Sequence, residues 1–330
     1  MGRLHAEVVA RQVPGAELYA VADPDPDARA AIRAELGAGH AAAEATELLA
    51  LEELDAVVIT TPTSSHAELV RAAAAAGKAI FCEKPLALSV AETRSALDAV
   101  ERAGVLLQVG FMRRFDAAYR RAKGLIDAGQ IGRPISFKSV GRDPFCPRPE
   151  FADPAHSGGL IIDMGIHEFD AARWLMGSEV ERVSSEGGLL VCDTLAAVGD
   201  IDNALVNLRF ASGALGNVEV SRTAFYGYDI RTEVLGSEGA VSIGGYQHTP
   251  VLLLTPSGAQ HDVVPYLHER FGAAYRAEIQ HFVECVQRGL TPGVGGADAL
   301  AAFEIGLAAT RAQQTGQPVA LADLAQSMGV

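Results

Sequence analysis

Short apolar runs alternate with segments of helical periodicity along the first third of the chain. The runs 18–22, 56–59, 79–82 and 105–109 are predicted strands, and the segments 24–36, 65–76 and 90–103 are predicted helices. A continuous apolar run such as 56–59 is typical of a strand that is buried on both faces. This rhythm of strands and helices indicates βαβ units, and therefore a doubly wound parallel sheet with right-handed crossovers.

Capping residues mark the ends of these predicted helices. Ser64 or Ser65 can cap the second helix, and Gly77 is placed to end it. Ser89 can cap the third, with Glu92 three positions later as a capping-box partner. The loops 60–65 and 83–85 then follow directly after buried strands.

The pattern changes after residue 111. Apolar and polar positions alternate in 205–210 and 215–220, and again in 231–235 and 241–243, with turn residues between the members of each pair. Both pairs read as antiparallel hairpins. Helices are predicted at 116–128, 163–176, 273–288 and 298–315. We therefore expect a domain of parallel βαβ units over 1–111 and an α+β domain with antiparallel strands over 112–330.

Composition and charge narrow the class of protein. A chain of 330 residues with 49% apolar residues is long enough for two buried cores. The net charge of −14 disfavours nucleic acid as a partner. No apolar stretch is long enough to cross a membrane, and the start does not resemble a secretory signal. The four cysteines are widely spaced, which predicts buried, reduced thiols in a cytoplasmic protein.

One acidic residue points to a dinucleotide. Asp23 follows the strand 18–22, where a carboxylate can accept hydrogen bonds from both ribose hydroxyls of NAD and would repel the 2′-phosphate of NADP. The alternative is an ordinary helix N-cap. A strand and a glycine turn normally precede this segment. The chain starts too late to contain them, since Gly2 already resembles the last glycine of that turn. We therefore expect a truncated or misplaced start and an upstream extension of about ten residues.

Two further segments carry candidate chemistry. Lys84, in Glu83-Lys84-Pro85, follows a buried strand and can donate to a substrate hydroxyl; the alternative is a surface lysine in a loop. Asp163 and His167 are four residues apart on one predicted helix, where the carboxylate can orient the imidazole as a base.

For that isolated pair the alternative is an N-cap aspartate with a surface histidine. Glu168 and Asp170 point away from the pair because of the helical twist. A zinc site would need a third ligand, and the spacing of His156 is not diagnostic of one, so no metal is expected.

Together these segments resemble the Gfo/Idh/MocA oxidoreductase family, and within it the enzymes that act on inositols. The similarity extends over almost the whole chain and lies in MGRLHAEV at the start, AVADPD around Asp23, TTPTSSHAE from Thr60, FCEKPLALS from Phe81, QVGFMRRFDAAY from Gln108, GGLIIDMGIHEFDAARWL from Gly158, YGYD from Tyr226 and RFGAAYRAEIQHFV from Arg270.

The resemblance implies an N-terminal Rossmann domain and a C-terminal α+β domain with a large, mainly antiparallel open sheet. It also implies an NAD-dependent oxidation of an inositol ring hydroxyl by a homotetramer assembled through that sheet. Lys84, Asp163 and His167 would be catalytic, and Arg113, Asp143 and Tyr228 would contact the polyol. The residues implied to hold NAD are Gly2, Asp23, Thr60, Thr61, Pro62, His66, Glu83 and Lys84.

One local departure leaves the substrate open. Gly141 and Asp143 stand where related inositol enzymes tend to carry a histidine and an asparagine, at positions that would face the polyol. The alternatives are therefore another polyol or aldose dehydrogenase on the same scaffold, or a non-catalytic protein that senses NAD or a sugar.

Overall fold

The computed structural model describes residues 1–327, and these form two compact units. The first unit contains Met1–Phe115 and Ala273–Leu300, and the second contains Asp116–Gly272 and the described residues from Ala301 onward. The chain therefore returns to the first unit late in its sequence. No helix within 1–327 combines the length and apolar character needed to cross a lipid bilayer.

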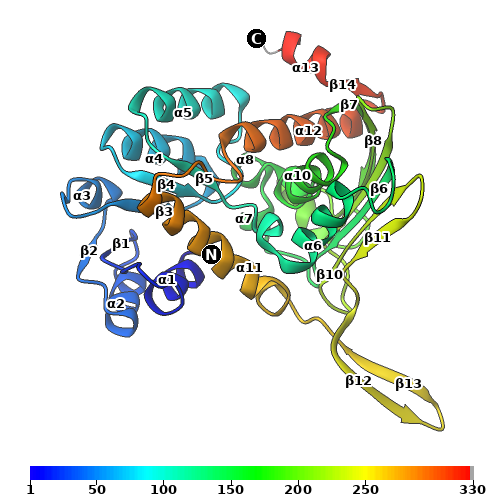
Figure 1. Cartoon of the computed structure of the whole chain (residues 1–330), viewed down its shortest axis with the longest axis horizontal. Coiled ribbons are helices and arrows are strands. Elements are labelled where there is room, and N and C mark those ends of the chain that lie inside the picture. The colour runs from blue at the N-terminus through cyan, green and yellow to red at the C-terminus, as the bar shows by residue number, and fades with distance from the viewer. Residues whose placement is uncertain (328–330) are drawn as a thin grey trace. The chain divides into compact units, whose positions relative to one another are not determined.

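The first unit contains the parallel strands that the sequence predicts. They are β1 (Ala20–Ala22), β2 (His40–Ala42), β3 (Ala56–Ile59), β4 (Ala79–Cys82) and β5 (Leu107–Val109), and every pairing among them is parallel (Figure 1). The accompanying helices are α1 (Gly2–Arg11), α2 (Pro26–Leu36), α3 (Ala45–Leu49), α4 (Thr63–Ala75), α5 (Val90–Ala103) and the 3-10 helix η1 (Met112–Phe115). This confirms the Rossmann-type alternation.

These strands form two sheets. One has the order β1-β2 and the other has the order β3-β4-β5, and within residues 1–327 no strand joins β1 to β3.

Helix caps in this unit are partly as predicted. The hydroxyl of Ser89 accepts a hydrogen bond from the Glu92 N–H, and Gly104 ends α5 in the left-handed conformation. The prediction that Ser64 or Ser65 caps α4 is wrong, because the N-cap is Pro62 and the hydroxyl of Ser65 donates to the main chain there. Pro62 has an extended backbone conformation suited to an N-cap, so α4 begins at Thr63, two residues earlier than predicted.

The core of the first unit explains why a late segment belongs to it. Phe81 of β4 is fully buried in a cluster with Val8 and Val13 from the start of the chain. Ile279 and Phe282, from α11 (Leu267–Arg288), complete this cluster. Burial of such large side chains contributes about 2–3 kcal/mol each, so this part of α11 is bound to the first unit by apolar packing.

The second unit is built on a seven-stranded sheet with the order β11-β10-β6-β9-β8-β7-β14. All neighbours are antiparallel except β6 and β9, so the predicted mainly antiparallel sheet is confirmed. The strands are β6 (Pro134–Arg142), β7 (Val180–Gly188), β8 (Asn203–Phe210), β9 (Leu215–Ser221), β10 (Asp229–Gly236), β11 (Ala240–Ile243) and β14 (Val319–Ala320). Both predicted hairpins are present as β8–β9 and β10–β11.

The helices of this unit come from several parts of the chain. They are α6 (Ala117–Asp127), α7 (Pro149–Ala152), α8 (Pro154–Ser157), α9 (Gly159–Asp163), α10 (Gly165–Met176), the 3-10 helix η2 (Asp193–Val198), the later part of α12 (Gly296–Thr315) and α13 (Leu321–Ser327). One face of the sheet is buried, as the alternating exposure of β8 shows. Its other face exposes polar residues and a few leucines.

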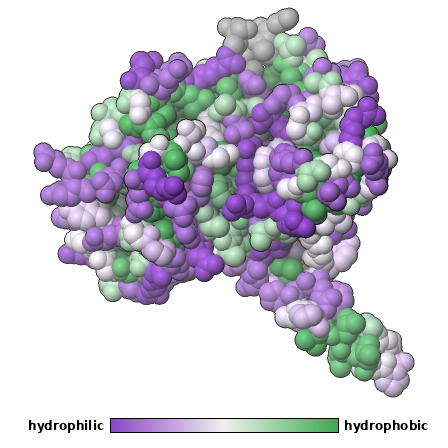
Figure 2. Space-filling model, in the orientation of Figure 1, coloured by the Kyte–Doolittle hydropathy of each residue, from purple (hydrophilic) through white to green (hydrophobic). Residues whose placement is uncertain are grey.

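A long hairpin pairs only with itself. It consists of β12 (Gln247–Thr255) and β13 (Gly258–Val263), and it extends from the rest of the second unit (Figure 1). The consecutive residues Val251, Leu252, Leu253 and Leu254 are 55–74% exposed, and Figure 2 shows an apolar surface on this hairpin. Adjacent strand residues face opposite ways, so both faces of β12 are apolar there.

The cysteine prediction is half wrong. Cys146 and Cys192 form a disulfide with Cα atoms 5.7 Å apart, although 46 positions separate them in sequence. The loop that carries Cys192 folds around Asp202, whose carboxylate accepts the N–H groups of Leu190, Val191 and Cys192 at 2.6–2.9 Å. Sequence spacing could not show this loop geometry. Cys82 and Cys285 are free and buried, as predicted.

Candidate active site

The glycine at the start of α1 lies close to Thr60 of the loop after β3. Gly2 is the first helical residue, and a Cβ atom added there would lie 3.0 Å from Oγ1 of Thr60. The first turn of α1 contains no acidic residue. A helix N-terminus of this kind attracts phosphate through its unpaired N–H groups and its dipole. The structure thus brings together Gly2 and Thr60, two of the predicted NAD-binding residues.

Asp23 follows β1 directly and does not serve as the helix cap. The cap of α2 is Asp25, whose carboxylate accepts the N–H of Asp27 at 2.9 Å. Asp23 accepts the N–H of Asp25 through Oδ1 alone. The N-cap alternative for Asp23 is therefore wrong, and this position at a strand end suits a ribose contact.

The His66 side chain contacts both the loop after β3, at Thr61, and the loop that contains Lys84 and Pro85. Its imidazole is buried, and its nitrogens lie 2.8 Å from the carbonyl oxygens of Thr61 and Pro85. Both partners are acceptors, so a protonated ring satisfies both and a neutral ring satisfies one. The ring holds Thr61 and the Lys84–Pro85 peptide, whose bond is cis, at a fixed separation.

Lys84 lies in the loop after β4, next to a buried carboxylate. The Glu83 N–H donates to the Ile59 carbonyl at 3.0 Å, which continues the parallel ladder by one residue. Glu83 is 7% exposed, and its carboxylate lies 2.7 Å from Nε2 of His5. Burial opposes its ionisation, but the His5 hydrogen bond and the nearby charges of His5, Lys84 and His66 lower the pKa of Glu83.

Arg113 is also in the first unit. It lies in η1, which follows β5, and it is 3% exposed. A buried guanidinium at the carboxyl end of a parallel sheet is in the region where ligands bind in such folds. The neighbouring Arg114 has a different role, because it forms an ion pair with Asp298 at 2.8 Å.

The predicted acid–base pair lies in the second unit, but not on one helix. Asp163 is the last residue of α9 and His167 is in α10, with Met164 between the two helices. The expected single helix over 163–176, with Asp163 at its N-terminus, is therefore wrong. Asp163 instead accepts from Nη2 of the buried Arg222 at 3.3 Å. Arg222 also forms an ion pair with Asp200.

Tyr266 connects the other candidates of this unit and was not found from the sequence. Its ring lies 5.4 Å from the ring of Tyr228. Burial raises the pKa of Tyr266, and the negative charges of Asp143 and Asp163 raise it further. Asp143 and Asp163 are therefore near enough to Tyr266 for their charges to act on its phenol, and Tyr228 lies against its ring. Tyr266 lies in an irregular segment before α11, and no motif marks it.

The glycine at position 141 is explained by a buried glutamate. A Cβ atom at Gly141 would lie 2.3 Å from Oε1 of Glu168. Glu168 is fully buried and accepts from the hydroxyl of Ser139. Glu168 is in α10, and its carboxylate lies against Ser139 and Gly141 of β6. A histidine at position 141 would not fit beside Glu168 as it stands.

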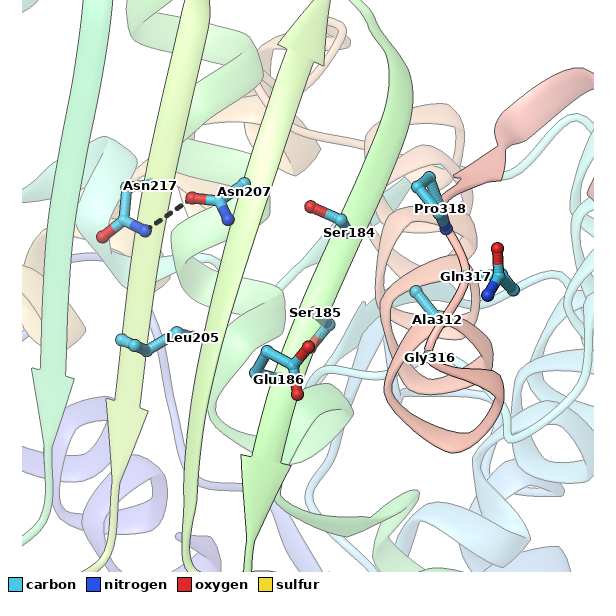
Figure 3. Close-up of a pocket in the computed structure, with 10 residues that line it drawn as sticks. All are labelled: Ser184, Ser185, Glu186, Leu205, Asn207, Asn217, Ala312, Gly316, Gln317 and Pro318. Carbon is cyan, nitrogen blue, oxygen red and sulfur yellow. Dashed lines mark hydrogen bonds between the residues drawn. The ribbon is translucent and has the colours of Figure 1, made fainter.

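A surface pocket in the second unit contains none of these residues. Figure 3 shows it between strands β7, β8 and β9 and the end of α12. Its lining residues are Ser184, Ser185, Glu186, Leu205, Asn207, Asn217, Ala312, Gly316, Gln317 and Pro318. Glu186 is the one charged residue in this lining, and none of the lining residues is predicted to bind NAD or the polyol.

These features define a class of protein. A parallel βαβ unit with a helix N-terminus at Gly2 and a carboxylate after β1 suits NAD, and the same chain continues into an α+β unit that contains Asp163 and His167. This is the arrangement of a Rossmann-type oxidoreductase.

The chain belongs to the Gfo/Idh/MocA oxidoreductase family. Residues 1–111 match the family's NAD-binding Rossmann fold, and residues 123–321 match its C-terminal alpha/beta domain.

Named relatives match over nearly the full chain. The scyllo-inositol 2-dehydrogenase (NAD(+)) of Bacillus subtilis is 46% identical over 97% of this chain and 93% of its own. The myo-inositol 2-dehydrogenase of Thermotoga maritima is 37% identical over 98% and 96%. A crystal structure of scyllo-inositol dehydrogenase from Lactobacillus casei with bound NAD(H) and scyllo-inositol has a TM-score of 0.92 and 28% identity, covering 97% of this chain and 96% of that chain.

The cofactor of this chain is NAD, and Asp23 gives a test of how it is held. We expect Asp23→Ala to raise the KM for NAD about 10–100-fold, because hydrogen bonds to a charged group contribute about 1.5–3 kcal/mol. The preference for NAD over NADP should fall at the same time. Steady-state kinetics with both cofactors measures this. Asp25→Ala is the matched control, since it removes a helix cap and should leave the KM for NAD unchanged.

Proposed function

We propose that this chain oxidises a ring hydroxyl of myo-inositol, or of a closely related inositol, to the keto-inositol. The observation that carries the proposal is the similarity to both a scyllo- and a myo-inositol dehydrogenase over 97–98% of the chain. Lys84, Asp163 and His167 lie within this similar region. The isomer is the part that needs experiment, because the two relatives carry different isomers in their names.

In the proposed reaction His167 removes the hydroxyl proton, and Asp163 orients the imidazole for that step. The ammonium of Lys84 stabilises the alkoxide that develops as the proton leaves. NAD, when bound, supplies the nicotinamide carbon that takes the hydride from the same carbinol carbon. The alcohol thus loses two electrons and two hydrogens, one as a hydride and one as a proton.

Three further residues are proposed to hold the polyol. Arg113 offers fixed N–H donors, Tyr228 offers a phenol, and Asp143 offers a carboxylate that can accept two hydroxyls. The ring contact between Tyr228 and Tyr266 restricts the orientation of Tyr228. Such rigid polar groups distinguish isomers that differ only in the direction of one hydroxyl.

A panel of substrates tests the proposal. Purified protein is mixed with NAD and, separately, with myo-inositol, scyllo-inositol, other inositols and several hexoses, and NADH absorbance is recorded. We expect the highest kcat/KM with an inositol. A higher value with a hexose would make the chain an aldose dehydrogenase. Tight NADH binding, read by fluorescence, without turnover of any compound would make it a sensor.

We also propose that the chain forms a homotetramer through the exposed face of the large sheet. On this face the register places Leu215 opposite Ser136, and Ser136 opposite Leu235. Both leucines are more than 40% exposed. Exposed leucines on an open sheet are typical of surfaces that become buried on association.

The assembly is tested with the double variant Leu215→Arg, Leu235→Arg. Charges on this face should reduce the molar mass measured by light scattering during size-exclusion chromatography to that of a smaller species. Leu290→Arg is the control, since Leu290 is equally exposed but lies in the first unit. A tetramer that survives the double substitution would place the interface on another surface.

A further inference from the structure

A buried polar cluster adjoins Lys84 in the first unit, and two of its three members, His5 and Glu278, have no role in the proposed reaction. It consists of His5 from α1, Glu83 after β4 and Glu278 from α11, each at most 7% exposed. One ligand atom from each residue lies within 4.8 Å of the other two. Three ionisable groups this close inside a core must divide their charge in a defined way.

Glu83 is held tightly as one member of this cluster. Its Oε1 lies 2.7 Å from Nε2 of His5, and its Oε2 accepts the N–H of Lys84 at 3.3 Å. At Gly110 an added Cβ atom would lie 2.9 Å from Oε2 of Glu83. The glycine therefore lets the carboxylate lie directly against the backbone at the end of β5, and the Glu83 side chain has little room to move.

Glu278 is the unusual member. Its side chain is fully buried, and neither of its carboxylate oxygens has a hydrogen-bond partner among the described residues. Its main-chain carbonyl accepts from the side chain of Gln108 at 2.8 Å, which fixes this turn of α11. An ionised carboxylate without hydrogen bonds costs several kcal/mol in a protein interior, whereas the neutral acid costs far less.

We propose that Glu278 is a positioning residue that holds a proton in this cluster, so that Glu83 is the single charged carboxylate beside Lys84. A second negative charge on Glu278 would repel Glu83 and pull His5 away from it. The protonated acid avoids this repulsion and keeps Glu83 on His5 and on the Lys84 N–H. The effect of this charge distribution on Lys84 rests on the proposed function. The proton on Glu278 can be measured without any substrate.

The titratable groups around the cluster support this division of charge. They are His5 on α1, His66 on α4, Cys82, Glu83 and Lys84 at the end of β4, and Glu278 on α11. Burial raises the pKa of Glu278 well above its usual value, and the negative charge of Glu83 raises it further. In Glu83 the hydrogen bond from His5 and the positive charges outweigh burial and lower the pKa.

The pH dependence of stability gives a signature that packing alone would not produce. When the pKa of Glu278 is higher in the folded than in the unfolded chain, its proton stabilises the fold at any pH below the unfolded-state pKa. This stabilisation decreases as the pH rises and is lost once the pH passes the folded-state pKa. Glutamine cannot lose that proton. The thermal midpoint of Glu278→Gln, relative to wild type, should therefore increase between about pH 4.5 and pH 8.

The matched variants respond differently in that window. Glu83→Gln removes the negative charge that raises the pKa of Glu278 but leaves the titrating Glu278 in place, so its difference from wild type should increase less in this window than that of Glu278→Gln. Glu284→Gln, an exposed residue on the same helix, should show no difference. A constant difference for Glu278→Gln would overturn the proposal.

Infrared spectroscopy provides a second measurement on the intact chain. At pH 8 the wild type should show the carbonyl band of a protonated carboxylic acid, and this band should shift after ¹³C labelling of glutamate and disappear in Glu278→Gln. A cation bound in the cluster requires ionised carboxylates and would remove the band. Absence of the band in wild type overturns the proposal. This outcome needs no folded variant, and it does not depend on the result of the substrate panel.

Discussion

Replacing His167 with alanine should lower kcat by about 10²–10⁴-fold, the usual contribution of a positioned general base. The imidazole is half-buried on α10, and its Nδ1 is shielded from solvent. Alanine leaves the hydroxyl proton without an acceptor in the transition state. The KM for the alcohol should change much less than kcat, because the ground-state contacts are proposed to come from Arg113, Asp143 and Tyr228.

The control for this prediction is His156→Ala. His156 lies in α8 of the same unit, and its side chain is 64% exposed beside Asp153. We expect wild-type kinetics for this variant, measured as NADH formation with the best alcohol of the substrate panel. Near-normal turnover in His167→Ala, or an equal loss in both variants, would remove His167 from the mechanism.

The second large effect is expected for Lys84→Met. Methionine keeps most of the side-chain length and removes the ammonium, and loss of one group that stabilises a developing oxyanion costs about 10²–10³ in kcat. The structural setting favours this role, because the Lys84 N–H is held by Glu83 and the following proline carbonyl is held by His66. Stopped-flow measurement of the first turnover separates this loss from slow product release.

Lys138→Met is the matched control, because it makes the same substitution and removes the same positive charge at another position. Lys138 is exposed on β6 in the second unit, and its loss should leave kcat unchanged. NADH binding by fluorescence is measured for both variants. If Lys84→Met weakened NADH binding but kept kcat, Lys84 would hold the cofactor without stabilising the alkoxide.

Local sequence patterns determined the secondary structure near these residues well. The strands 56–59 and 79–82 match β3 and β4, and the end of α5 at Ala103 was placed correctly. Buried parallel strands are continuous apolar runs, and Gly104 marks a left-handed helix end. The same patterns placed Asp23 and Lys84 directly after strands, which indicated dinucleotide chemistry.

Local patterns failed where a distant residue decides the outcome. The periodicity of 163–176 fits one helix, but the structure ends α9 at Asp163 and starts α10 at Gly165. In the structure Asp163 pairs with Arg222, which is 59 positions away. The Cys146–Cys192 disulfide has the same origin, since Asp202 organises the loop that carries Cys192.

The amino-acid sequence by itself determined the alternation of elements, the family and the candidate residues of each unit, because these depend on neighbours along the chain. The tertiary structure alone decided which groups share an environment. Tyr266 meets Tyr228, Glu168 fills the space at Gly141, and Glu278 reaches Glu83 across 195 positions of sequence. Charge and hydrogen bonding act through space over a few ångströms, so they follow the fold and not the order of residues.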